Sequence, residues 1–421
     1  MLGKLLPDSL RSLSRDATIL FVTRFIRLFA YGSLSVILVF YLVSLGLSEA
    51  QVGLLLTLTL AGDLVISLFL TTRADQFGRK RTLIVGAILM AAAGVAFAMT
   101  KSFFVLLVAG TIGVVSPSGN EVGPFLSIEQ ASLSYVVSQR SRTEVFAWYT
   151  LSGSIATALG AAFAGSAAEL LQKASVPAMQ SYRGIVLVYA ALGLILALLF
   201  VSLSPAAEVR PTTSEEEASK EPQHFLGVHH SRNVVLKLSS LFALDSFAGG
   251  FVIQSFAAYW FYLRFGVAPA KLGLIFFWAN VFAGISSLLA VRLAARFGLV
   301  RTMVFTHLPS NILLILVPLM PNLTLAALVL LARFSISQMD VPTRQSYTMA
   351  VVRPEERSAA GGITGAARTA GAAISPLFAG FLFSSPVLVN VPFFVAGALK
   401  ILYDVVLYRA FVTLRPPEER D

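Results

Sequence analysis

The chain has 421 residues, of which 56% are hydrophobic and only 13% are charged, and its mean hydropathy is +0.79. This composition is too apolar for a soluble domain of that length, and it predicts an integral membrane protein. The net charge of +10 fits membrane topology and not nucleic-acid binding, and the absence of cysteine excludes disulfides, thiolate metal sites and cysteine catalysis.

Twelve apolar segments follow one another along the chain, each long enough to cross a hydrocarbon core of about 30 Å. They lie at 17–45, 50–71, 83–100, 103–135, 143–170, 184–204, 235–264, 268–291, 302–320, 323–352, 358–384 and 388–412. We therefore expect an all-α membrane protein with twelve transmembrane helices. Lys and Arg concentrate in alternate connections, which places both termini in the cytoplasm. The alanine-rich composition and short connections are typical of a bacterial inner (plasma) membrane protein.

The sequence repeats itself at a distance of about 220 residues. Residues Gly46, Gly53, Phe77, Gly78 and Arg81 recur as Gly266, Gly273, Phe297, Gly298 and Arg301. A repeat of this length in a membrane protein predicts two pseudo-symmetric six-helix bundles. We expect them at residues 1–205 and 234–421, joined by a polar cytoplasmic linker at 206–233.

Between the second and third segments the chain reads TTRADQFGRKRTL, residues 71–83. This stretch resembles the loop signature of the major facilitator superfamily, although Thr71, Arg73 and Gln76 depart from it and Ala295 replaces the acid in the second copy. The resemblance implies a secondary transporter similar to the drug and small-solute exporter branch. It also implies a cytoplasmic gate formed by Asp75, Gly78, Arg79, Lys80, Gly298 and Arg301. The alternative is that the basic residues there only set the topology.

Ionisable residues inside membrane segments are costly, which makes them candidates for function. The candidates for a substrate or proton pathway, with one tyrosine on the face of the first segment, are Arg24, Arg27, Tyr31, Glu121, Glu129, Asp245, Arg333, Asp340 and Arg344. In the tenth segment, Arg333, Asp340 and Arg344 are spaced to form a single polar stripe on one helix.

The repeat aligns Glu129 with Arg344, and it places Asp245 opposite the position between Arg24 and Arg27. The charges are exchanged between the halves while their positions are kept. We predict ion pairs between Arg24 or Arg27 and Glu129, and between Asp245 and Arg344. Such pairs can also serve only to hold helices in register.

Two further acids, Glu121 and Asp340, precede prolines near the middle of the membrane. Neither has an obvious base at its own depth in the same half, although Arg27 could reach Glu121. A carboxyl group in a poorly hydrated cavity is a candidate proton carrier. The order of candidates is Asp340, Glu121 and then Asp245, with Asp63 as a fourth whose structural role is favoured.

These patterns predict a secondary active transporter that moves a small organic solute by alternating access, with proton-coupled export as the leading hypothesis. The alternative is an organic-anion carrier, by uniport or exchange, that uses the intramembrane arginines. A non-transporting membrane sensor is a minor alternative. No nucleophile–base or metal constellation indicates an enzyme, and we expect no cofactor, no metal and a monomer in the lipid bilayer. The linker histidines 224, 229 and 230 are interpreted as solvated loop residues rather than metal ligands.

Overall fold

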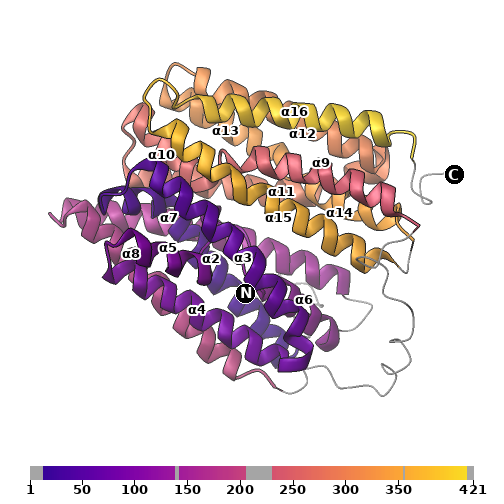
Figure 1. Ribbon diagram of the computed structural model, residues 1–421, viewed down its shortest axis with the longest axis horizontal. Helices are drawn as coiled ribbons and strands as arrows, with labels where there is room; N and C mark the ends of the chain where they lie inside the picture. The colour runs from indigo at the N-terminus through magenta and orange to yellow at the C-terminus, as the bar shows by residue number, and fades with distance from the viewer. Residues whose placement is uncertain (1–12, 138–141, 205–229, 354–355, 415–421) are drawn as a thin grey trace, which may run out of the picture. The chain divides into compact units, whose positions relative to one another are not determined.

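We describe a computed structural model of the chain, which covers residues 13–137, 142–204, 230–353 and 356–414. Within these ranges the regular structure is helical and contains no strand (Figure 1). In chain order the helices are α2 (Arg15–Ser44), α3 (Glu49–Phe77), α4 (Arg79–Met99), α5 (Phe103–Ile112), α6 (Phe125–Val136), α7 (Arg142–Lys173), α8 (Ala178–Val201), α9 (Arg232–Gly250), α10 (Gln254–Phe265), α11 (Pro269–Phe297), α12 (Leu299–Leu316), the 3-10 helix η5 (Val317–Leu319), α13 (Leu323–Ser337), α14 (Asp340–Ala350), α15 (Arg357–Phe383) and α16 (Val391–Phe411).

Eleven helical segments of the described chain are long and apolar enough to cross a membrane. The fourth predicted segment is the exception, because its apolar part is α5, with only 10 residues. The all-α membrane architecture predicted from the sequence is confirmed.

The chain divides into two compact units. The first consists mainly of the N-terminal half together with residues 267–277, and the second mainly of the C-terminal half together with residues 48–61. The same pairing of helices occurs inside each: α2 packs on α7 and α4 on α8 in the first unit, and α9 packs on α15 and α12 on α16 in the second. This correspondence is the structural counterpart of the sequence repeat.

Glycines bring the paired helices into backbone contact. A Cβ atom at Gly160 of α7 would lie 2.1 Å from the carbonyl oxygen of Phe29 in α2. In the second unit, a Cβ at Gly371 of α15 would lie 2.3 Å from the carbonyl oxygen of Ala243 in α9. Small residues at such crossings permit the close approach that membrane helices use in place of hydrophobic burial.

Three of the predicted segments contain an interruption between two helices. Residues 113–124 separate α5 from α6, residues 251–253 separate α9 from α10, and residues 338–339 separate α13 from α14. In the longest interruption, Gly119 and Gly123 have φ values of 73° and 78°, which side chains with a Cβ rarely adopt. Pro124 follows directly and precedes the first residue of α6, so the chain turns here before a new helix begins.

An apolar core in the second unit holds four helices together. Leu238 and Phe242 of α9, Met303 of α12, Tyr347 of α14 and Tyr403 of α16 are all buried in it. Six charged or titratable residues described below, Asp245, His307, Asp340, Arg344, Lys400 and Asp404, lie on the same four helices, so this packing fixes their positions.

Candidate functional site

A fully buried ion pair joins α2 to α6 in the first unit. Arg27 donates from Nη1 to Oε1 of Glu129 at 2.6 Å and from Nη2 to Oε2 at 2.7 Å, and neither side chain is exposed. Glu129 also accepts hydrogen bonds from the hydroxyl of Thr23 at 3.1 Å and from that of Tyr149. The pair predicted from the sequence is present. Because both carboxylate oxygens have several donors, it is complete without a ligand.

Arg24 pairs with Glu121 rather than with Glu129. Its Nη1 lies 2.7 Å from Oε1 of Glu121, and its guanidinium covers the ring of Tyr149 at 4.4 Å from the centroid. Arg27 reaches the same carboxylate, with Nε 3.2 Å from Oε2. Glu121 is therefore paired: its contact with Arg27 was anticipated from the sequence, whereas its contact with Arg24 was not. Its depth could not be judged from helical spacing, because it lies in the non-helical segment 113–124.

The non-helical segment 113–124 is held by side chains of α3 and α2. Asp63 accepts hydrogen bonds from the backbone N–H of Gly123 at 2.6 Å and from the hydroxyl of Ser67 at 3.2 Å. Tyr31, which is fully buried, donates to the carbonyl oxygen of Val122 at 3.4 Å. These contacts agree with the structural role favoured for Asp63, and they place Tyr31 against backbone.

Asp245 on α9 is the centre of a second group of charges, in the second unit. Lys400 of α16 donates to its Oδ1 at 2.5 Å, and Arg344 of α14 donates to its Oδ2 at 3.3 Å. His307 of α12 lies on the Oδ1 side, with Nε2 at 3.7 Å. The predicted contact with Arg344 is present, but the shorter contact is with Lys400, which the sequence analysis missed.

Asp340 is also paired, which is the second correction to the predicted free acids. Nη1 of Arg344 donates to its Oδ2 at 2.8 Å, one helical turn along α14. The polar stripe predicted for the tenth segment is interrupted at residues 338–339, so Arg333 on α13 does not share a continuous helix face with Asp340.

Two arginines of the second unit are shielded from solvent and yet have no carboxylate partner among the described residues. Arg333 on α13 and Arg368 on α15 are half-buried, and the Nε atom of each is buried without a hydrogen-bond acceptor in the described part of the chain. Both are close enough to Asp245 and Asp340 to interact electrostatically with them, and Arg368 also interacts with Arg344.

These residues form what we call the unit-2 cluster: Asp245, His307, Arg333, Asp340, Arg344, Arg368, Lys400 and Asp404. Its four permanent cations face three carboxylates, so it carries one excess positive charge when His307 is neutral. The first unit differs, because Arg24 and Arg27 are matched by Glu121 and Glu129.

His307 and Asp404 complete the cluster, and the sequence analysis assigned neither to the pathway. Nδ1 of His307 lies 2.8 Å from Oδ1 of Asp404, and Asn311 donates to Oδ2 of the same carboxylate at 2.8 Å. The spacing of polar residues in the sequence could have indicated both His307 and Asp404. His307 and Asn311 lie four residues apart on α12, as Lys400 and Asp404 do on α16, so each pair shares one helix face.

The two glycines of the predicted gate each precede the first residue of a helix, at equivalent positions in the two halves. Gly78 precedes α4 with φ 95°, and Gly298 precedes α12 with φ 86°. Lys80 donates to the carbonyl oxygen of Leu203, just beyond the end of α8, at 2.8 Å. Arg79 is buried, whereas the side chain of Asp75 lies outside the described part of the structure. The role of these residues as a gate stays a prediction.

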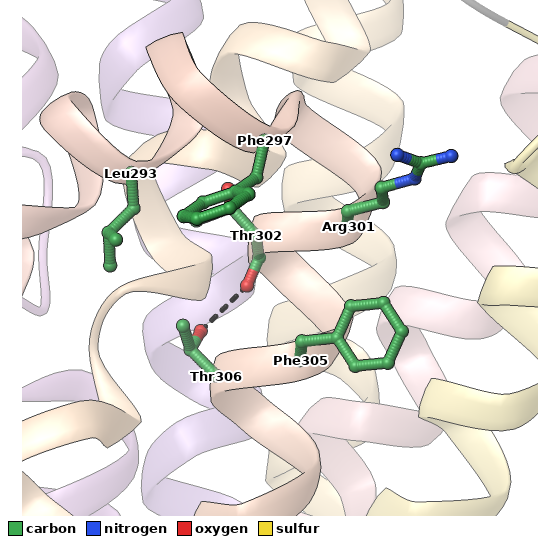
Figure 2. Close-up of a pocket in the computed structure, with 6 residues that line it drawn as sticks. All are labelled: Leu293, Phe297, Arg301, Thr302, Phe305 and Thr306. Atoms are coloured by element: carbon green, nitrogen blue, oxygen red, sulfur yellow. Dashed lines mark hydrogen bonds between the residues drawn. The ribbon is translucent and has the colours of Figure 1, made fainter.

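A pocket of about 340 Å³ lies beside the second gate turn, between α11 and α12 (Figure 2). It is lined by Leu293, Phe297, Arg301, Thr302, Phe305 and Thr306. The hydroxyl of Thr306 donates to the carbonyl oxygen of Thr302 at 2.8 Å, and the rings of Phe297 and Phe305 are half exposed. The pocket is therefore an apolar recess on the surface of the unit, separate from the charged cluster.

No group of three or more acidic or histidine side chains within the described ranges could hold a metal ion. Of the linker histidines, 224 and 229 lie outside the described residues. The backbone N–H groups of His230 and Ser231 donate to Glu356 at 2.7 and 2.9 Å, so this carboxylate binds the start of α9.

The sequence matches the Major Facilitator Superfamily over residues 20–264 and again over 241–421. It is 30% identical to the uncharacterized membrane protein YJR124C of Saccharomyces cerevisiae over 424 residues, covering 95% of this chain and 94% of that protein. A shorter match, 30% identical over 104 residues, covers 25% of this chain and 27% of the quinolone resistance protein NorA of Staphylococcus aureus. The solved structure of a single-residue mutant of the nucleoside transporter NupG has a TM-score of 0.74 at 14% identity, covering 94% of this chain and 99% of that one.

The signature loop, the internal repeat and the matching helix pairs in the two units agree with these similarities. The family match spans nearly the whole chain, and the likeness to NupG extends over the complete fold. The chain therefore belongs to the Major Facilitator Superfamily and is a multi-pass membrane transporter of a solute, not an enzyme.

Proposed function

We propose that the chain carries an organic anion across the membrane by alternating access and that the unit-2 cluster binds it. The observation that carries the proposal is the pair of half-buried arginines, Arg333 and Arg368, without a carboxylate partner in the described chain. An unpaired cation at membrane depth is costly and calls for an anionic partner. A carboxylate, sulfonate or phosphate group would accept charge-assisted hydrogen bonds from the guanidinium groups.

An aromatic ring beside one of these arginines favours an anion with a carbon skeleton over an inorganic ion. The guanidinium of Arg333 lies 5.1 Å from the ring centroid of Phe334, which is half-buried and has surface left for a ligand. Such a surface would add apolar contact to the charge contact, which is the usual composition of a small-molecule site. The first unit offers no comparable excess of charge, because Arg24 and Arg27 are paired with glutamates.

Proton-coupled export of an organic compound is a second candidate. The similarity to NorA over a quarter of the chain supports it, since that relative is a quinolone resistance protein. The free central acids on which the sequence-based hypothesis relied are paired, so this candidate needs a different proton carrier.

Three further features belong to the same proposal. The bias of Lys and Arg supports cytoplasmic termini. The buried ion pairs of both units form within one chain, which supports a monomer. The alanine-rich composition supports a bacterial inner membrane, whereas the similarity to a yeast protein supports a eukaryotic one equally well.

The proposal is tested by the thermal stability of the purified protein with benzoate, citrate or taurocholate, and with the cation tetraphenylphosphonium. We expect at least one of the anions to raise the unfolding temperature. Arg333→Gln and Arg368→Gln should each lower the affinity of the protein for that anion by about tenfold or more, because a hydrogen bond to a charged group contributes about 1.5–3 kcal/mol. The matched control is Arg264→Gln, which removes an exposed arginine of α10. Stabilisation by the cation alone, or unchanged anion affinity in both variants, would contradict the proposal.

A further inference from the structure

A buried imidazole lies between two carboxylates in the unit-2 cluster. His307 is 4% exposed, with Nδ1 2.8 Å from Asp404 and Nε2 3.7 Å from Asp245. Asp404 is fully buried and has no Lys or Arg in ion-pair contact among the described residues; its other neighbour is the amide of Asn311 at 2.8 Å. His307 is therefore the cation that Asp404 has within reach, provided that the imidazole is protonated.

The hydrogen-bond network defines where a proton would add. The carboxylate of Asp404 is an acceptor, so we assign the ring hydrogen of His307 to Nδ1; Nδ2 of Asn311, which lies 3.2 Å from Nδ1, donates to the other oxygen of Asp404. In the neutral ring, Nε2 is then left with a lone pair directed toward Asp245. A proton from water that adds to Nε2 produces an imidazolium with an N–H facing each carboxylate, and no other bond changes.

Charged and titratable groups face this imidazole directly or through Asp245. Asp404 and Tyr403 of α16 contact the ring, and Asp245 of α9 lies 3.7 Å from it. The groups that reach it through Asp245 and Asp340 are Lys400 of α16, Arg344 of α14, Arg333 of α13 and Arg368 of α15. Lys400 and Arg344 already neutralise Asp245, so a proton on His307 increases the excess positive charge of the cluster from one to two. Histidine is the side chain that ordinarily changes charge between about pH 5 and 8.

We propose that His307 is the proton-binding site of this transporter and that its protonation strengthens the binding of an anion to the unit-2 cluster. The second half of the statement rests on the proposed function. Since coupling between two ligands is reciprocal, bound anion would favour protonated His307 as much as the proton favours the anion. Proton and anion would then occupy the carrier together.

The proton site is tested directly in a full-length variant in which His224, His229 and His230 are replaced by Gln, so that His307 is the single histidine. We expect the ¹⁵N signals of its imidazole to change reversibly as the pH is varied from 5 to 9, which would show that the ring takes up and releases a proton. Signals that stay constant from pH 5 to 9 would overturn the proposal.

The coupling is tested by the affinity for benzoate and taurocholate, whose own charge does not change, at pH 6 and pH 8. For an anion that binds, we expect about fivefold or greater tightening at pH 6, and we expect His307→Gln to bind it equally at both pH values. Gln keeps an N–H donor for Asp404 without a titrating group. A pH dependence that persists in His307→Gln would overturn the proposal.

If none of the anions binds, the proposed function fails, and the proton site at His307 is then tested in the protein without a ligand. In the single-histidine protein, Arg368→Gln removes one cation from the cluster, so the titration midpoint of His307 should move to higher pH. A midpoint that does not move would mean that His307 is not coupled to the charge of the cluster, and the inference would fail as well.

Discussion

The variant Arg27→Met tests whether the buried pair with Glu129 holds α2 and α6 together. Arg27 has no exposed surface, and it donates both Nη groups to a carboxylate that has no exposed surface either. Met has a similar length and no charge, so the variant removes the cation without opening a large cavity. Glu129 would keep only the hydroxyl groups of Thr23 and Tyr149 as donors.

Removing one partner of a buried ion pair costs about 3–5 kcal/mol, because the remaining charge has no counterion and no water. Arg24 cannot replace Arg27, since it is held against Glu121 at 2.7 Å. The double variant Arg27→Met, Glu129→Gln removes the stranded charge and keeps an acceptor for Tyr149. We expect it to recover at least about 2 kcal/mol of the loss, the rest being the cost of unmade hydrogen bonds.

The free energy of unfolding in mixed detergent micelles, followed by circular dichroism, gives these differences. The matched control is Lys173→Met, which breaks an exposed pair with Glu169 at 2.7 Å on α7 and should cost under about 1 kcal/mol. If Arg27→Met costs no more than the control, or if the double variant is as unstable as the single one, the pair does not have the structural role we assign to it.

Two further changes test the packing. Gly160→Ala should destabilise the protein by about 1–3 kcal/mol in the same unfolding measurement, because a Cβ there meets the carbonyl oxygen of Phe29 at 2.1 Å. The control is Gly362→Ala on α15, where a Cβ meets nothing within 4 Å, and this variant should be neutral or stabilising. Asp63→Ala should lower the unfolding temperature more than Asp63→Asn does, because the amide still accepts from the N–H of Gly123; equal effects would mean that this contact does not hold the segment.

The sequence predicted the architecture because membrane segments are long and uniform in composition. The charge exchange between the halves was also readable, since the repeat aligned Glu129 with Arg344 and so led to both ion pairs. Helical spacing failed where the helix is interrupted. Glu121 lies in a non-helical segment, so its depth and its contact with Arg24 do not follow from its position in the chain.

Partners on helices distant in sequence were missed for a different reason. Lys400 and His307 carry no motif, and their contact with Asp245 depends on how α16 and α12 pack against α9. The internal repeat did not indicate Lys400 and His307 either, because the aligned residues of the first half are not charged. A search for pairs of polar residues four positions apart in apolar segments would have found His307 with Asn311 and Lys400 with Asp404.

The difference between the two charge clusters makes a prediction that needs no ligand. Arg24 has Glu121 at 2.7 Å, so Arg24→Gln leaves that carboxylate with Arg27 alone, which already serves Glu129. Arg368 has no acid in contact within the described residues and interacts unfavourably with Arg344. Arg368→Gln should therefore leave the unfolding temperature unchanged or raise it, whereas Arg24→Gln should lower it. If Arg368→Gln is the more damaging of the two in the absence of any anion, Arg368 has a partner within the protein, and the charge excess assigned to the second unit does not exist.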